Sequence, residues 1–166
     1  MPLYEIHHST PLSGPQRDAL AQSITYTHTR KFTVPSLFVN VRFIDTSQEK
    51  NYIGGKEQAI NRIVCYVRAG GTRTADDFND LALKLQDIWD KTVNSERSKE
   101  KALNRVFVMG AITAGVENGF LLPKASEDVD WLQQNYPKFQ ELAAAGDNDF
   151  VGLVNEFNER DDPKAA

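Results

Sequence analysis

The chain has 166 residues, enough for one compact domain with a sizeable core. Hydrophobic residues make up 40% of it and charged residues 25%, and the net charge is -4. This balance is typical of a soluble protein and argues against general binding to nucleic acid or to a membrane surface. Any cationic site must therefore be local.

Targeting and redox signals are sparse. No apolar run approaches the ~20 residues of a membrane helix, and the N-terminus lacks the basic and apolar regions of a signal peptide. We therefore expect a cytoplasmic protein. Cys65 is the only cysteine, which excludes an intrachain disulfide and a cysteine metal cluster. Its position in the apolar run 63–67 predicts a buried, unreactive thiol.

Pro2 directly precedes a predicted strand at residues 3–8, where apolar and polar side chains alternate. Removal of Met1 would leave Pro2 as a free secondary amine. An α-amino group titrates near ~8, and an apolar pocket beside a cation favours its neutral form. Such an amine could act as a base near neutral pH. Many chains begin with Met-Pro only because of N-terminal processing, so this hypothesis needs support from other residues.

Two strand-helix-strand units follow one another along the chain. The first has the strand at 3–8, a turn cluster at 9–15, helical spacing over 19–28 and a strand over 34–44. The second has a strand at 61–68, a turn at 69–72, a helix that begins with the capping pair Thr74 and Asp77, and a strand at 106–110. The two units are offset by about 60 residues and share little sequence identity.

This repeat predicts an α+β fold, with a duplicated β-α-β motif in one two-layer domain. Right-handed crossovers would place both helices on one face of the sheet. The other face then needs cover, and for a chain of this size we expect another subunit to supply it.

The remaining segments form a hairpin and a helical extension. Asn118-Gly119 stands between apolar segments, which is a strong signal for a tight turn that Glu117 would begin. Beyond Pro123 we predict short helices at 126–135 and 137–145, and a last amphipathic turn or two at 150–157. The predicted organisation is a core at 1–123, a helical extension of the same domain at 124–158, and a disordered tail at 159–166.

Three polar residues stand where chemistry is possible, and each also has a plain structural interpretation. His28 lies on the apolar face at a helix end, as a satisfied buried histidine or as a ligand-binding group. Arg73 precedes a helix N-terminus, a position that favours anions, although a solvated loop arginine is common. Glu117 is a candidate general base or a surface carboxylate.

Several short motifs, in order, resemble the tautomerase superfamily. They are Met1-Pro2, the helix end Ile24-Thr25-Tyr26-Thr27-His28, Ile53-Gly54-Gly55, the loop Thr72-Arg73-Thr74-Ala75-Asp76, and Glu117-Asn118-Gly119-Phe120-Leu121-Leu122-Pro123. The branch that the chain resembles is that of cis-3-chloroacrylic acid dehalogenase and its relatives, including fungal oxalocrotonate tautomerase-like proteins. The resemblance spans about residues 2–123, and its strength lies in the order and spacing of the motifs.

The resemblance implies a duplicated β-α-β fold, commonly assembled as a trimer, that uses no cofactor and no metal. In this family the N-terminal proline lies at the bottom of a pocket and acts as a base in tautomerisation or, protonated, as an acid in hydration. That role falls to Pro2. The residues that hold the substrate carboxylate would be His28 and Arg73, and the glutamate that activates water would be Glu117.

The sequence also departs from the dehalogenase pattern. Gly70 stands where that branch has a second arginine, with Arg68 two residues farther back as a further substrate-binding candidate. Val108 falls near the position of a tyrosine that helps to place the attacking water. Both departures disfavour dehalogenation, whereas proton transfer by Pro2 needs neither group. Asn40 and Arg42 are additional polar candidates on one sheet face, and the sequence leaves open which of them faces a pocket.

The leading hypothesis is a tautomerase or isomerase that acts on a small unsaturated 2-oxo or 2-hydroxy acid, with Pro2 as proton shuttle and Arg73 and His28 anchoring the carboxylate. The alternative enzyme is a hydratase or weak cis-3-haloacrylate dehalogenase in which Glu117 activates water. A non-catalytic trimeric binding scaffold is a third possibility, because fold alone does not determine function. The expected partners are a small carboxylate substrate and two further copies of the chain, without nucleic acid or membrane.

Overall fold

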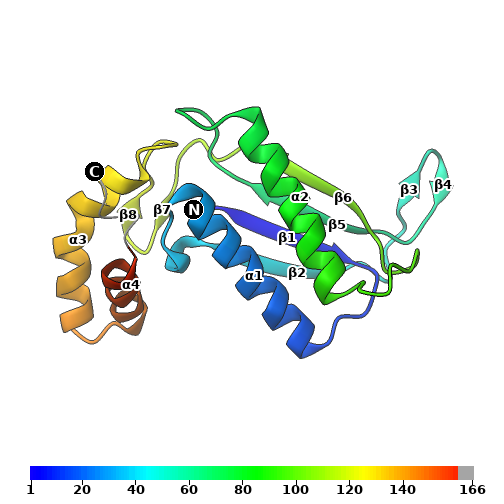
Figure 1. Cartoon of the computed structure of the whole chain (residues 1–166), viewed down its shortest axis with the longest axis horizontal. Helices are drawn as coiled ribbons and strands as arrows, with labels where there is room; N and C mark the ends of the chain where they lie inside the picture. Colours follow the sequence, from blue (N-terminus) through cyan, green and yellow to red (C-terminus); the bar gives the residue numbers. More distant parts are fainter. Residues whose placement is uncertain (161–166) are drawn as a thin grey trace.

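The computed structural model describes residues 1–160, which form a four-stranded sheet with two long helices against one face and a helical extension at one end (Figure 1). The predicted disordered tail at 159–166 is wrong for its first two residues, because Glu159 ends the last helix and Arg160 is buried and donates to the Val34 carbonyl. Residues 161–166 lie outside the described residues. The strands of the main sheet are β1 (Leu3–His8), β2 (Asn40–Asp45), β5 (Asn61–Tyr66) and β6 (Leu103–Met109). Their spatial order is β2-β1-β5-β6.

The predicted duplication is confirmed by the strand pairing. β1 and β2 are parallel and are joined by α1 (Gly14–Phe32), while β5 and β6 are parallel and are joined by α2 (Ala75–Thr92). The two units meet where β1 pairs antiparallel with β5. Both helices lie on the same sheet face, as right-handed crossovers require (Figure 1).

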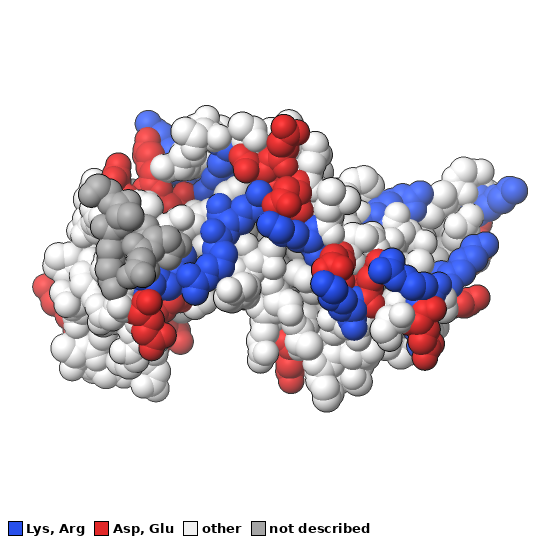
Figure 2. Space-filling view, viewed as in Figure 1, with Lys and Arg blue, Asp and Glu red and all other residues white. Residues whose placement is uncertain are grey.

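Local sequence signals explain where the two long helices begin. Ser13 caps α1 by accepting from the Gln16 N–H, and the Gln16 side chain accepts from the Ser13 N–H. Thr74 and Asp77 form the same reciprocal capping box at the start of α2, as predicted. Basic side chains at the end of α1 lie beside acidic side chains at the start of α2 (Figure 2). One such pair is Lys31 and Asp80, with Lys31 Nζ 2.8 Å from Asp80 Oδ2.

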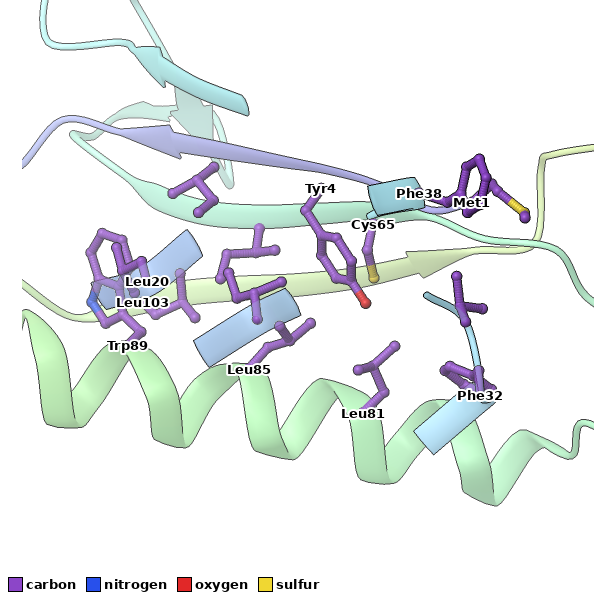
Figure 3. Close-up of a cluster of buried hydrophobic side chains, with 14 of the residues drawn as sticks. Met1, Tyr4, Leu20, Phe32, Phe38, Cys65, Leu81, Leu85, Trp89 and Leu103 are labelled. Atoms are coloured by element: carbon purple, nitrogen blue, oxygen red, sulfur yellow. The ribbon is translucent and has the colours of Figure 1, made fainter. Parts of the chain in front are cut away.

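The core lies between the sheet and the two helices. Leu81, Leu85 and Trp89 project from α2 toward the sheet, where they meet Tyr4 and Cys65 (Figure 3). Cys65 is fully buried, and burial raises the pKa of its thiol to about 12, in agreement with the predicted unreactive cysteine. Met1 and Phe38 close one end of this core.

Two predicted elements are wrong in detail. The strand expected over 34–44 is shorter, because Pro35 precedes the 3-10 turn η1 (Ser36–Phe38), and pairing with β1 begins only at Asn40. The two helices expected at 126–135 and 137–145 are one helix, α3 (Asp128–Ala144). Pro137 removes one backbone donor without ending it, since Leu132 and Phe139 bury apolar side chains on either side of the proline.

The remaining elements are short hairpins and a last helix. The hairpins are β3 (Tyr52–Ile53) with β4 (Lys56–Glu57), and β7 (Val116–Glu117) with β8 (Phe120–Leu121). Asn118 and Gly119 have φ of 49° and 83°, the left-handed conformations that the predicted tight turn requires. The last helix is α4 (Asn148–Glu159). Among residues 1–160, no helix combines the length and apolar character needed to cross a bilayer.

The helical extension joins the core through an aromatic cluster. Phe139 is fully buried, and its ring centroid lies 4.8 Å from that of Phe120 and 5.6 Å from that of Phe150. Trp131 also packs against this ring, and Phe38 from η1 lies on the core side of the cluster. The extension therefore sits beside the β7–β8 hairpin, at the end of the sheet where the chain begins (Figure 1).

Candidate active site

The first residues of the chain lie in a pocket of about 360 Å³ between β1, β2 and the β7–β8 hairpin. Its lining includes Met1, Pro2, Asn40, Glu117 and Leu122. Pro2 is buried, and its carbonyl accepts from the Asn40 N–H at 3.1 Å, which ties the start of β1 to β2. Pro2 and Glu117, which are 115 positions apart in the sequence, therefore face the same small volume.

The terminal amine is held in an environment that disfavours its protonated form. In the chain with Met1 in place, burial, followed by the positive charge of Arg68, lowers the pKa of the Met1 amine to about 5. The carboxylates of Glu117 and Asp128 act in the opposite direction. This end of the sheet can therefore keep an amine neutral at physiological pH.

Glu117 is positioned by its hairpin and by one hydrogen bond. The Asn40 side chain donates from Nδ2 to Glu117 Oε1 at 2.9 Å. The other carboxylate oxygen, Oε2, is buried and has no hydrogen-bond partner among the described residues. Burial raises the pKa of Glu117, while the nearby amine and Asn40 oppose that shift. Oε2 can therefore accept a hydrogen bond from a water molecule or a ligand that enters the pocket.

Of the two polar residues on β2, Asn40 is the one that lines the pocket. Arg42 is exposed, and its Nη1 lies 3.6 Å from Glu5 Oε1 on the sheet face away from the helices. This resolves the choice that the sequence left open.

His28 is buried at the end of α1, as its spacing from Leu20 and Ile24 predicts. Its Nδ1 lies 2.6 Å from the Tyr4 hydroxyl oxygen. Burial, together with the nearby terminal amine and the two arginines, holds the pKa of His28 well below its usual value. Burial also raises the pKa of Tyr4, so both partners are neutral. His28 can therefore offer a hydrogen bond but not a positive charge.

The two arginines meet one carboxylate. Arg73 Nη2 donates to Asp128 Oδ2 at 2.6 Å, and Arg68 Nη2 donates to Asp128 Oδ1. The Arg73 guanidinium also lies over the Phe32 ring, with Cζ 4.6 Å from the centroid. The side chain of Arg73 is only 7% exposed, so the interpretation as a solvated loop arginine is wrong. The arginines that the sequence suggested for a substrate carboxylate here hold a carboxylate from α3.

Sequence reasoning missed Tyr4 and Asp128. Tyr4 points to the core by strand alternation, but nothing local indicates that it meets a histidine 24 positions later. Asp128 belongs to the first turn of a helix, where an acidic side chain usually faces solvent. Its partners lie 55 and 60 positions earlier, so only the tertiary fold reveals them.

Known proteins share this fold. A member of the cis-3-chloroacrylic acid dehalogenase family, N1, is 21% identical with a TM-score of 0.63, and the match covers 86% of this chain and 99% of that one. A fused 4-OT, described as a wild-type asymmetric trimer, is 15% identical with a TM-score of 0.55, covering 72% of this chain and 94% of that one. A probable enzyme from the thermophilic fungus Aspergillus fumigatus is 24% identical with a TM-score of 0.57, covering 81% and 94%.

At the level of sequence, no curated protein matches the chain, but a family model does. The family described as "Putative oxalocrotonate tautomerase enzyme" matches residues 1–136, which include every strand and both helices of the duplicated unit. The tautomerase resemblance carried by the short motifs is thereby confirmed, and the chain belongs to this family of the tautomerase superfamily.

Proposed function

We propose that the protein is a cofactor-free tautomerase that uses the Pro2 amine, after removal of Met1, to move a proton on a small unsaturated 2-oxo or 2-hydroxy acid. The observation that supports this most strongly is the enclosed N-terminus, where the pKa of the Met1 amine falls to about 5. The amine of Pro2 would begin one residue farther into the same pocket. Membership of the tautomerase family supports the reaction type.

The proposed proton transfer needs only one group that both accepts and donates. The neutral amine takes the proton from the 2-hydroxyl of an enol, and the electrons of the O–H bond form the carbonyl. The electron pair of the C=C bond then forms a new C–H bond at the carbon next to the carbonyl, with the proton that the ammonium gives back. A lowered pKa matches the amine to this task, because a base that is neutral at working pH is immediately available.

The other site residues take supporting roles in this proposal. Arg68 and Arg73 would hold the substrate carboxylate, since guanidinium groups suit a planar carboxylate with two oxygens. Asn40 would keep Glu117 in place through its 2.9 Å hydrogen bond. His28 would add a neutral hydrogen bond rather than a charge, because its pKa is well below the usual value.

One observation favours hydration as a second candidate reaction. Glu117 Oε2 is buried without a hydrogen-bond partner among residues 1–160, and its raised pKa suits a base that takes a proton from water. Against dehalogenation, position 108 holds a valine, so this side chain supplies no hydroxyl for the water. Addition of water to cis-3-haloacrylate at the carbon that carries the halogen gives a halohydrin that releases halide. Halide release by the unchanged chain that is lost in Glu117→Gln would therefore favour this second reaction.

We further propose a homotrimer built on the sheet face that the helices leave uncovered. Phe107 and Met109 on β6 are each 46% exposed on that face, which is unusual for large apolar side chains of one strand. A related structure is described as a trimer. Within each subunit, the core at 1–123 and the extension at 124–158 would belong to one domain. A trimer that forms but has no activity would correspond to the non-catalytic scaffold hypothesis.

Ketonisation of phenylenolpyruvate, followed by ultraviolet absorbance, tests the proposed function. We expect turnover by the chain that begins at Pro2, as verified by intact mass, and loss of turnover when the terminal amine of the same preparation is acylated, because an amide nitrogen is not a base. A chain that keeps Met1 serves as a matched control, because the nitrogen of Pro2 is then part of a peptide bond and cannot act as a base. Full turnover by the Met1-retaining chain would exclude the Pro2 mechanism.

A further inference from the structure

One carboxylate of the chain already occupies the arginine pair. The two oxygens of Asp128 are divided between the two guanidinium groups, Oδ1 with Arg68 and Oδ2 with Arg73. The side chains of Arg68, Arg73 and Asp128 are 5%, 7% and 5% exposed. A small acid that bound these arginines through its carboxylate would compete with Asp128 for the Nη2 donors of both guanidinium groups.

The segment that carries Asp128 is fastened to the arginine loop by several contacts. Arg68 Nη1 donates to the carbonyls of Pro123 and Lys124 at 2.5 and 2.7 Å. The Thr72 N–H donates to Ser126 Oγ at 2.9 Å. All of these bonds involve residues 123–128, the connection between the β7–β8 hairpin and α3. We call this connection the Asp128 segment.

A glycine makes the close approach possible. Gly71 has φ of +61°, and a Cβ at this position would lie 2.5 Å from the Ala125 carbonyl oxygen. Any other residue would push the Asp128 segment away from the loop and would also be strained in its backbone. The docked arrangement therefore depends on the residue type at position 71.

Other features weaken the docked state. Ser126 has a left-handed φ of 73°, which is unfavourable for a residue other than glycine. Glu127 precedes α3 without making a side-chain cap. Lys124, Ser126 and Glu127 are exposed, so the polar groups of the segment can be solvated when it moves. The contacts to Arg68 and Arg73 therefore hold the Asp128 segment in a conformation that the backbone strain at Ser126 and the uncapped start of α3 disfavour.

We propose that Asp128 is a specificity-determining residue that competes, as an internal ligand, with the substrate carboxylate for Arg68 and Arg73. This inference rests on the proposed function for its substrate class, small unsaturated acids. Binding of substrate displaces the Asp128 segment, so simple carboxylates are excluded. Arg68 and Arg73 do not themselves line the pocket of Pro2, Asn40 and Glu117, so only an acid that extends from the arginines into that pocket gains further contacts that offset the loss of the internal pair.

The Pro2 pocket is electrostatically linked to this exchange. The charges of Arg68, Asp128 and Arg73 all act on the pKa of the terminal amine, with Asp128 opposing the two arginines. An incoming carboxylate would replace the charge of Asp128, so the amine would stay in a similar field during the exchange.

Binding of benzoate and acetate to Asp128→Ala, measured by calorimetry and by thermal unfolding, tests the inference. We expect at least about tenfold tighter binding than to the unchanged chain, because charge-assisted hydrogen bonds become available to the added acid. The variant should unfold at a lower temperature, and acetate should restore part of that loss. Asp130→Asn removes an exposed carboxylate from the same helix turn and should behave like the unchanged chain.

Two results would overturn the inference. If Asp128→Ala is less stable and neither acid restores stability or binds more tightly, Asp128 is a structural brace. The same conclusion follows if the unchanged chain already binds acetate as tightly as the variant. Should Asp128→Ala fail to fold, Gly71→Ala provides a second test. It leaves both arginines intact, is expected to undock the segment, and should likewise bind benzoate more tightly.

These readouts are independent of turnover. Tighter acid binding by Asp128→Ala in a protein that does not ketonise phenylenolpyruvate would support the internal ligand and reject the proposed function. If turnover depends on Pro2 but Asp128→Ala binds acids no more tightly than the unchanged chain, the proposed function is supported and the internal ligand is rejected.

Discussion

Replacement of Pro2 by alanine is expected to lower kcat/KM for phenylenolpyruvate ketonisation by at least about a hundredfold, because a positioned acid-base group typically contributes 10²–10⁴-fold. Alanine leaves a primary amine on a more flexible residue, so both the basicity and the position of the nitrogen change. The measurement is steady-state ketonisation by preparations whose N-termini have been verified by mass.

Pro11→Ala is the matched control for this change. Pro11 is an exposed turn residue between β1 and α1, and its replacement leaves the pocket untouched. We expect activity close to that of the unchanged chain. Equal losses in both variants would mean that Pro2 acts through the fold, and no loss in Pro2→Ala would remove the amine from the mechanism.

Truncation of Phe139 should cause the largest loss of stability. The side chain is fully buried between Phe120 and Phe150, and removal of a buried phenylalanine side chain costs about 3–5 kcal/mol. For a chain of this length the loss corresponds to a decrease in Tm of very roughly 6–20 °C. Calorimetry of Phe139→Ala measures it, and Leu121→Ala, at a side chain that is 75% exposed, should change Tm by little.

The same experiment tests how the chain is organised. Because the aromatic cluster joins Phe38 and Phe120 of the core to Phe139 and Phe150 of the extension, we expect one cooperative transition that shifts as a whole. A separate early transition, with the main one unchanged, would show that the helices after residue 123 form an independent unit.

Features with local causes could be predicted from the sequence. The Thr74–Asp77 capping box, the Asn118-Gly119 turn and the burial of His28 each follow from residue types at fixed spacing, and the structure has all three. The errors at Pro35 and Pro137 have a common origin. Proline removes one backbone donor, and whether an element ends there depends on packing that spacing does not encode.

Asp128 is one of the two site residues that the sequence does not reveal. A carboxylate at the start of a helix is usually explained by the helix dipole, so its sequence context gives no hint of two arginine partners. Those contacts arise because the segment before α3 returns to the loop at Gly71, a long-range approach that follows from the fold. Arg68 does not stand at the family's second arginine position, yet in the structure it shares the carboxylate of Asp128 with Arg73.

The pKa of the Pro2 amine in the chain without Met1 decides whether Pro2 can shuttle a proton as a neutral base. It can be measured by NMR titration and compared with the pH dependence of kcat/KM. We predict a pKa well below the ~8 of a free α-amino group, so that the amine is neutral at pH 7 and activity falls only when the pH drops through that value. A pKa at or above ~8 would contradict proton shuttling by a neutral amine, because Pro2 would then be protonated and suited only to act as an acid.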